Sequence, residues 1–324
     1  MEANQIIIAL ILLILIWTLI EQKLLITSRY QIKSQGLPKE WDGTNIVVLA
    51  DLHNCSFGKN NERLVKRIDK LAPDYILVVG DMINKRAASY PSNSFLLLES
   101  LAKKYKIYYS YGNHEQKLDD YEKAIDQVTS EDAKLPSKQL QSNGQSTTAT
   151  GENSNLEQPK ELYSSWLKYR NNLTQRNINF LDNKSVSLTK KGASIRITGF
   201  SMSLEYFERH KMLELSQSYL KESIGENRKN EYQILMAHHP FYFKDYAAWG
   251  ADLVVSGHVH GGMVRLPGIG GLLSPQAKFF PKYQSGLYKE NSKVMVVSRG
   301  LGSHSIMPRL FNIPEIVFLR LEKE

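Results

Sequence analysis

Residues 45–53 read NIVVLADLH, a run of apolar, largely β-branched residues that ends at an aspartate and a histidine. A run of this length with polar residues at its ends is typical of a buried β-strand. The pattern returns at 75–81 (YILVVGD), at 232–238 (YQILMAH) and at 251–258 (ADLVVSGH). A shorter version at 107–114 (IYYSYGNH) leads into an asparagine and a histidine. The recurrence predicts several buried strands, each of which ends at polar side chains.

Helical patterns separate the early strands. Residues 61–71 place Leu64, Ile68 and Leu71 on one helical face, and residues 93–103 have a similar apolar spacing. Alternating strands and helices indicate an α/β domain. The second half contains more strand patterns, at 185–188, 194–199, 293–298 and 316–321. We therefore expect a second sheet packed against the first, within a domain that spans 45–324.

A polar insertion interrupts this domain. Residues 130–160 contain almost no apolar side chains that could be buried, so we expect a disordered or mobile segment there. A helical pattern resumes at 161–172 and carries Leu162, Trp166 and Tyr169. The insertion is therefore expected to lie between two ordered parts of one domain.

The N-terminus predicts a membrane anchor. Residues 6–20 are apolar apart from Thr18, and extending the run to Ile26 gives enough helix to cross a hydrocarbon layer of roughly 30 Å. A cleaved signal peptide is disfavoured because MEANQ lacks Lys and Arg and no small-x-small cleavage site follows. We expect a transmembrane helix within an anchor at 1–27, followed by a connector at 28–44.

Charge near this anchor suggests an orientation. Lys23, Arg29 and Lys33 follow the apolar segment, whereas only the terminal amine precedes it. The positive-inside rule favours a single-pass protein of the cell membrane with a cytoplasmic catalytic domain. The formal net charge of +8 also suits anionic partners, such as phosphate esters or an acidic membrane surface. The one cysteine, Cys55, excludes an intrachain disulfide and is interpreted as a small buried residue.

Histidines gather after the predicted strands. Six of the eight follow strand patterns: His53, His114, His238, His239, His258 and His260, whereas His210 and His304 do not. Each is uninformative alone, because a single buried histidine is usually a structural residue. However, functional loops in α/β sheets lie together at the carboxyl ends of the strands. With two aspartates and an asparagine in equivalent places, the pattern predicts one shared site.

The residue types at this site indicate transition metals. Imidazole, carboxylate and amide ligands without thiolate suit Mn, Fe, Zn or Co better than a structural zinc site. The candidate ligands are Asp51, His53, Asp81, Asn113, His238, His258 and His260. Seven ligands are too many for one ion. Two divalent or mixed-valence ions about 3.5–4 Å apart, bridged by one carboxylate, would use all of them. Such a pair holds a bridging hydroxide for in-line attack on a phosphoryl group.

The order of these blocks resembles a known family. Asp51-x-His53, Gly80-Asp81, Gly112-Asn113-His114-Glu115, His238 and Gly257-His258-x-His260 look like the calcineurin-like metallophosphoesterases. The likeness extends to the bacterial membrane-associated branch, in which GHxHGG precedes a glycine- and proline-rich segment, here 266–288. The resemblance implies a four-layer αββα sandwich, in which two packed mixed β-sheets are flanked by helices.

The resemblance also implies roles for the site residues. Asp51, His53 and His260 would hold one metal, and Asn113, His238 and His258 the other, with Asp81 as the bridge. His114 would lie beside the leaving group, where it protonates that group or stabilises developing charge. His239 would be no ligand. Val259 and Met263 replace a threonine and a glutamine frequent in this branch, which leaves the substrate contacts open. Arg299 is a tentative substrate-phosphate contact, and Arg309 has the same two readings, phosphate contact or structural residue.

These features predict a membrane-anchored hydrolase of a phosphomonoester, phosphodiester or pyrophosphate. A tether favours lipid-linked substrates, as in relatives that cleave nucleotide-diacylglucosamine pyrophosphates, although it can equally localise an enzyme with soluble substrates. The aromatic residues at 279–288 either line a lipid-accepting mouth or pack on the sheet.

Three other functions fit the sequence less well. A catalytically silent membrane scaffold would lack ligands, and none is missing. A nuclease is disfavoured because no long basic stripe is present, so nucleic acid is not an expected partner. A metallo-β-lactamase-like hydrolase lacks its H-x-H-x-D-H block.

Overall fold

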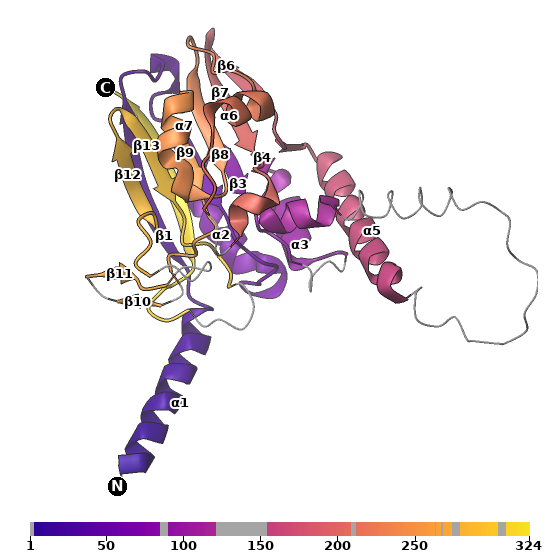
Figure 1. Cartoon of the computed structure of the whole chain (residues 1–324), viewed down its shortest axis with the longest axis vertical. Helices are drawn as coiled ribbons and strands as arrows, with labels where there is room; N and C mark the ends of the chain where they lie inside the picture. The colour runs from indigo at the N-terminus through magenta and orange to yellow at the C-terminus, as the bar shows by residue number, and fades with distance from the viewer. Residues whose placement is uncertain are drawn as a thin grey trace, which may run out of the picture.

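The computed structural model describes residues 3–84, 90–120, 154–208, 212–262, 264–266, 268–273, 279–303 and 309–324. Within this part of the chain, two six-stranded sheets pack face to face and helices cover both outer faces (Figure 1). Most of the insertion predicted at 130–160 lies outside the described residues, as do His210, His304 and Met263.

The first sheet has the order β1-β14-β2-β3-β4-β5. Its strands are β1 (Ile26–Ser34), β14 (Glu315–Lys323), β2 (Asn45–Leu49), β3 (Tyr75–Val79), β4 (Lys106–Ser110) and β5 (Ile178–Phe180). Strands β2 to β5 run parallel, and β14 is antiparallel to β2 but parallel to β1. The register pairs Val48 with Val317 and with Leu77, so apolar side chains from neighbouring strands share a face.

The second sheet has the order β12-β13-β9-β8-β7-β6. Its strands are β12 (Gly286–Glu290), β13 (Lys293–Val297), β9 (Leu253–Ser256), β8 (Tyr232–Ala237), β7 (Ala193–Phe200) and β6 (Ser185–Lys190). The four central strands are parallel, and the two edge strands are antiparallel to their neighbours. Both sheets are therefore mixed.

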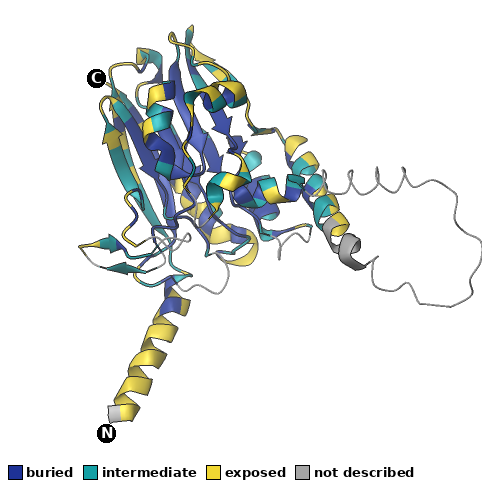
Figure 2. Ribbon diagram, viewed as in Figure 1, coloured by how far each residue is buried: buried dark blue, intermediate teal, exposed yellow. Residues whose placement is uncertain are grey.

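Three apolar cores separate four layers. Helices α2 (Glu62–Leu71), α3 (Asn93–Ala102) and α5 (Ser154–Thr174) cover the first sheet, and α6 (Gln217–Ile224) and α7 (Phe243–Trp249) cover the second. Between the sheets, Val48 and Val79 lie in one core with Ile234 and Val255. Figure 2 shows the resulting buried centre, with exposed residues on the outer faces of the helices. The predicted αββα sandwich is confirmed.

Short elements complete the described chain. They are the 3-10 helices η1 (Lys39–Trp41), η2 (Lys59–Asn61), η4 (Leu204–Phe207) and η5 (Pro240–Tyr242), and the strands β10 (Arg265–Leu266) and β11 (Gly270–Gly271). Local capping sets two helix starts, since Ser92 accepts from the Phe95 N–H and Ser216 from the Tyr219 N–H. The segment predicted as a connector at 28–44 contains most of β1, which pairs with β14 along its whole length.

An apolar helix, α1 (Ala3–Glu21), projects from one end of the domain (Figures 1 and 2). Its described side chains are exposed apart from Thr18 and Glu21, which lie where the helix meets the domain. There the Glu21 carboxylate accepts a hydrogen bond of 2.8 Å from the Phe311 N–H. Among the described residues, this helix alone is long and apolar enough to cross a membrane, and a signal sequence would also have these properties.

Strand direction determines which strand ends lie near α1. Strand β1 begins at Ile26, shortly after α1 ends, and runs away from the helix. Because β14 is parallel to β1 and antiparallel to β2, the carboxyl ends of β2, β3 and β4 lie at the α1 end of the domain. Two backbone hydrogen bonds connect this region, from Glu315 N–H to Gly300 and from Gly302 N–H to Asp51.

Candidate metal centre

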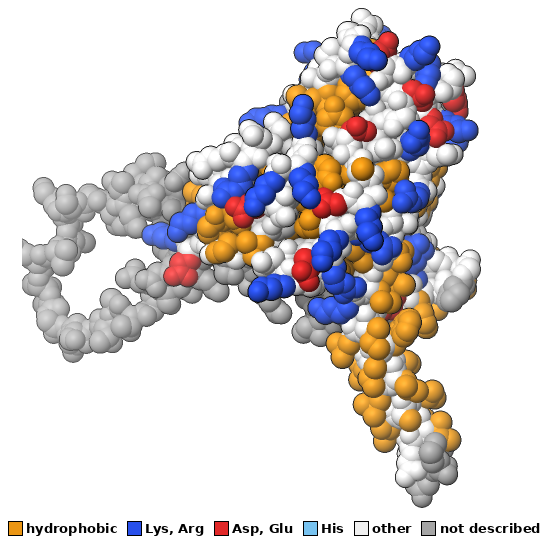
Figure 3. Space-filling model, turned by 180° about the vertical axis from the view of Figure 1, so that it is seen from behind, with side chains coloured by type: hydrophobic (Ala, Val, Ile, Leu, Met, Phe, Trp, Pro, Cys, Tyr) orange, Lys and Arg blue, Asp and Glu red, His pale blue; other side chains and the backbone are white. Residues whose placement is uncertain are grey.

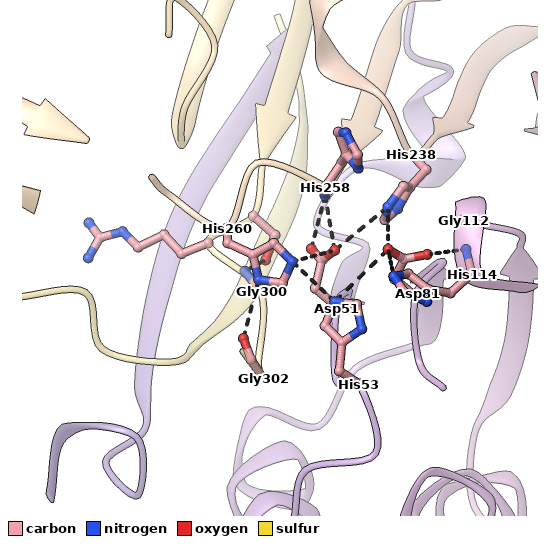
Figure 4. A network of polar contacts seen from close by, with 12 residues as sticks. Asp51, His53, Asp81, Gly112, His114, His238, His258, His260, Gly300 and Gly302 are labelled. Atoms are coloured by element: carbon pink, nitrogen blue, oxygen red, sulfur yellow. Dashed lines mark hydrogen bonds and ion pairs between the residues drawn. The ribbon is translucent and has the colours of Figure 1, made fainter. Parts of the chain in front are cut away.

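The strands deliver the candidate ligands to one place. Loops after β2, β3, β4, β8 and β9 carry them, and Figure 4 shows six of the seven converging. The converging set is Asp51, His53, Asp81, His238, His258 and His260, and all six side chains are buried. Three sets of ligand atoms lie close enough to hold metal ions: Asp51/His53/His260, Asp81/His238/His258 and His53/Asp81/His114. The first two sets bring together the residues that the sequence analysis assigned to the two metals, apart from Asn113.

The backbone turns sharply at these positions. Asp51, Asp81 and His258 have φ values of 54°, 53° and 69°, and His53 and His260 have 47° and 53°. This left-handed region is unfavourable for residues with a side chain, and such strain is concentrated at functional sites. These turns end each strand and direct the side chain that follows it towards the cluster of candidate ligands.

The first set is centred on Asp51. His260 Nε2 lies 3.5 Å from Asp51 Oδ1, and His53 Nε2 lies 3.1 Å from His260 Nε2. Nδ1 of His260 lies 3.3 Å from the Gly302 carbonyl, which orients Nε2 towards the carboxylate. The Asp51 carboxylate is held in place by the His258 N–H at 3.1 Å from each oxygen.

The second set is centred on Asp81. His238 Nε2 lies 3.2 Å from Asp81 Oδ2 and 3.7 Å from Asp51 Oδ1. The same Oδ2 lies 4.0 Å from His53 Nε2, so it faces histidines of both sets. The other oxygen, Oδ1, accepts a 2.9 Å hydrogen bond from the His114 N–H. One oxygen of Asp81 is thus held by the backbone, and the other lies between the two sets.

Asn113 fits the same centre. Its side chain is buried, and none of the described residues donates a hydrogen bond to Oδ1. A buried amide oxygen without a donor is costly, and a cation satisfies it. The donor set of imidazole, carboxylate and amide therefore fits the pair of transition metals expected from the sequence.

Glu115 supports the centre from behind, a role that the sequence did not reveal. Its carboxylate is fully buried and accepts hydrogen bonds from the N–H groups of Asp81 and Met82, both at 2.8 Å. It also accepts from the Gly112 N–H at 3.0 Å and the Tyr109 hydroxyl at 2.7 Å. Glu115 therefore joins the loop after β3 to the loop after β4.

Comparison with known proteins agrees with this geometry. Residues 44–262 match the family described as calcineurin-like phosphoesterase. The chain belongs to this family. Two relatives come from Bacillus subtilis (strain 168). The metallophosphoesterase YkuE is 24% identical over 94% of this chain and 87% of its own length, and YkoQ is 23% identical over 88% and 86%.

Two solved structures show a distant similarity to the chain. Phosphopantetheinyl hydrolase from Mycobacterium tuberculosis is 11% identical, with a TM-score of 0.40, over 79% of this chain and 89% of its own. A dimetal phosphatase from Danio rerio is 13% identical, with a TM-score of 0.33, over 80% and 88%. Family membership and the clustered ligands identify the chain as a metal-dependent phosphoesterase.

Burial and neighbouring charges shift the pKa values of several groups at the centre. Burial raises the pKa of Asp51 to about 7, although His238 opposes the shift. Burial would lower the pKa of His238, but Asp81 and Asp51 outweigh it and raise this pKa to about 10. Burial and neighbouring histidines hold the pKa of His258 well below its usual value, so this imidazole is neutral, the form that binds metals.

The two arginines differ in surroundings. Arg309 is buried and donates to backbone carbonyls of Asn312 at 2.7 Å, Arg299 at 2.6 Å, and Gly302. Its guanidinium therefore holds the loop beside Asp51, in agreement with the structural reading. The Arg299 side chain is partly exposed, and its Nε lies 3.8 Å from Oε1 of the buried Glu315.

Proposed function

We propose that the chain is a membrane-anchored, two-metal phosphoesterase that hydrolyses a phosphomonoester, phosphodiester or pyrophosphate close to the bilayer. The observation that carries the proposal is the position of Asp81 Oδ2, which faces histidines of both ligand sets. A carboxylate in this place can serve two cations at once, which is the arrangement that phosphoryl transfer by two metals requires.

The ligand assignment follows the two sets. Asp51, His53 and His260 would hold one ion, and Asn113, His238 and His258 the other, with Asp81 shared. Two ions of Mn, Fe, Zn or Co bound there would supply a nucleophile at neutral pH and neutralise charge on the phosphoryl oxygens. The protein's own contribution is the fixed orientation of each imidazole, such as that of His238, whose Nδ1 lies 2.6 Å from the Val79 carbonyl.

His114 is proposed as the catalytic residue. Its Nε2 lies 3.9 Å from Asp81 Oδ2, and its side chain is more exposed than those of the proposed ligands. An imidazole at the rim of the centre can deliver a proton to a leaving alkoxide or stabilise its charge. Arg299, also partly exposed, is proposed to contact the substrate phosphate.

The membrane part of the proposal rests on α1 and on strand direction. The helix is apolar and exposed, and the edge that carries the candidate ligands lies at the α1 end of the domain. An anchored enzyme of this shape would present its centre towards the bilayer, which favours lipid-linked phosphate esters as substrates. Lys23, Arg29 and Lys33 favour a cytoplasmic location for the domain.

The test uses the full chain in neutral detergent. Metal content is measured by mass spectrometry, and Mn²⁺-dependent hydrolysis is measured on bis-p-nitrophenyl phosphate, p-nitrophenyl phosphate and a lipid pyrophosphate. We expect about two metal ions per chain in the wild type, with metal and activity both lost in Asp81→Asn. The control Glu222→Gln, at an exposed carboxylate of α6, should retain both. A wild type without metal or activity on any substrate would favour the silent scaffold, and salt-dependent DNA binding would favour a nuclease.

A further inference from the structure

Helix α2 has one strongly basic face. Arg63, Lys66, Arg67 and Lys70 follow one another at helical spacing and are exposed, while Leu64, Ile68 and Leu71 are buried against the first sheet. Together with the exposed Arg29 of β1, these four side chains line an open hollow of about 570 Å³. We call these five residues the basic face.

No described carboxylate lines the hollow of the basic face, although Glu62 begins the same helix. Among the described residues, none of its five cations forms an ion pair, and the other lining residues are Thr27 and Leu71. Asp69, on the same helix, is engaged elsewhere, because it lies 2.7 Å from Lys104 Nζ and accepts from the Tyr105 hydroxyl. Five adjacent cations repel one another unless an anion neutralises them, so this surface suits a polyanionic partner.

The position of the basic face suggests which partner. Arg67 Nε donates a 3.2 Å hydrogen bond to Oγ1 of Thr27, the second residue of β1, and only four residues separate β1 from the end of α1. Such a link spans at most about 18 Å from Glu21 to Ile26. Figure 3 shows Lys and Arg side chains gathered on the domain directly above the apolar helix. The basic face therefore lies where a spanning α1 would leave the hydrocarbon.

Exposed apolar side chains occur at the same end. Ile269, Phe279, Phe280 and Phe311 are each more than half exposed. The N–H of Phe311 is bonded to Glu21 at the end of α1, and Phe311 and Ile269 line one hollow of about 450 Å³. Large apolar and aromatic side chains beside cations are typical of surfaces that sit in the headgroup region of a membrane.

We propose that the basic face docks on anionic phospholipid headgroups of the bilayer that α1 crosses, so that the domain lies against the membrane. The inference rests on the anchor in the proposed function and goes beyond it, because an anchor alone does not require this face of the domain to contact lipid headgroups. Lys and Arg close to an anionic leaflet are attracted to it, and this attraction falls off within a Debye length of about 8–10 Å. Docking should therefore depend on lipid charge and on salt.

The test measures how close α2 comes to the lipid. The full chain, with Cys55→Ser and Glu62→Cys, carries a nitroxide on α2 and is reconstituted into phosphatidylcholine nanodiscs with or without phosphatidylglycerol. Accessibility to a water-soluble nickel chelate is measured by power saturation. We expect phosphatidylglycerol to lower accessibility by about threefold or more, and high salt to reverse the change. A nitroxide at Lys191→Cys, in the turn between β6 and β7 at the opposite end, should show no change.

A matched pair of charge variants makes the test specific. Replacing Arg63, Lys66, Arg67 and Lys70 by Gln should abolish the lipid dependence. Replacing Lys39, Lys106, Lys229 and Lys289 by Gln, all exposed lysines at the opposite end, should preserve it. Hydrolysis of a soluble ester should be unchanged in both.

Equal accessibility in the two kinds of nanodisc would overturn the inference and leave the proposed function standing. If the detergent-solubilised chain binds DNA and the basic-face variant does not, the inference is overturned and nucleic acid is the partner instead. Failure of the chain to enter nanodiscs would overturn the anchor and this inference together, and ester hydrolysis in the same sample would show whether the catalytic part of the proposal survives.

Discussion

Replacing Glu115 by Gln tests whether the centre depends on a residue that is not itself a candidate ligand. The two oxygens of Glu115 share four donors: Oε2 accepts from Asp81 and Gly112, and Oε1 from Met82 and Tyr109. A glutamine can keep its oxygen on the Asp81 side. Its NH₂ group would then face the Tyr109 hydroxyl and the Met82 N–H. The hydroxyl can rotate and accept a hydrogen bond from the NH₂ group, whereas the Met82 N–H can only donate and would lose its acceptor.

The magnitude follows from this count. One buried N–H loses its acceptor, which costs about 1–3 kcal/mol, and the remaining bonds lose the contribution of the charge, about 1 kcal/mol more. A neutral glutamine avoids the cost of burying a carboxylate, which offsets part of this loss of stability. That cost is visible in Glu115, whose pKa is raised by burial and by Asp81. We expect a net loss of about 1–3 kcal/mol of unfolding free energy, or a Tm lower by about 2–5 °C.

The assay is thermal unfolding of the full chain in detergent, together with metal affinity. Because all seven proposed ligands remain, metal binding should weaken by only about 10–100-fold rather than disappear. Tyr109→Phe removes one of the four donors and should give a smaller decrease in Tm, whereas Glu222→Gln should give none. An unchanged Tm and metal affinity in Glu115→Gln would refute the idea that this carboxylate holds the two loops together.

Three further predictions concern the same centre. A Cβ added at Gly112 would lie 2.2 Å from Asp81 Oδ1, so the Gly112→Ala variant should lose metal. A Cβ at Gly192 would have no atom within 4 Å, so Gly192→Ala should keep its metal and lose only about 1 kcal/mol of unfolding free energy. Equal metal content in the two variants would contradict this prediction. His114→Ala should retain about two metals while turnover falls about 10²–10⁴-fold, with the larger loss on an alkyl ester than on p-nitrophenyl esters; loss of metal would make it a ligand instead. Arg309→Met should lower the unfolding free energy by about 3 kcal/mol or more, because it leaves several buried carbonyls without donors. Unchanged thermal unfolding would show that the loop beside Asp51 does not need this guanidinium for its stability.

Local sequence patterns predicted many of the elements that carry the centre. Strands β2, β3 and β8 begin at the predicted residues and end one or two residues before Asp51, Asp81 and His238. Runs of β-branched and aliphatic residues in these places have few alternatives to a buried strand. Helices α6 and α7 and strand β5 were not predicted. They have eight, seven and three residues, too short for apolar periodicity to show above chance.

The pairing of strands that are distant in the chain could not be predicted from the sequence either. Strand β1 pairs in parallel with β14, from the other end of the chain, and nothing in residues 26–34 indicates that partner. The roles of Glu115 and Arg309 depend on the same kind of contact. Each is an ordinary charged residue in the sequence, and each becomes a support only where distant backbone groups surround it.

The sequence by itself determined which chemical groups this phosphoesterase brings to its centre, because the composition of each loop and its place after a strand are local properties. The tertiary structure alone decided that Asp81 Oδ2 faces histidines of both sets, and that Asp51 is buried enough for its pKa to rise to about 7. Distances between loops and the loss of solvent around a carboxylate arise only when the two sheets pack. For that reason the candidate ligands could be named from the sequence, while their spacing, charge balance and supporting hydrogen bonds could not.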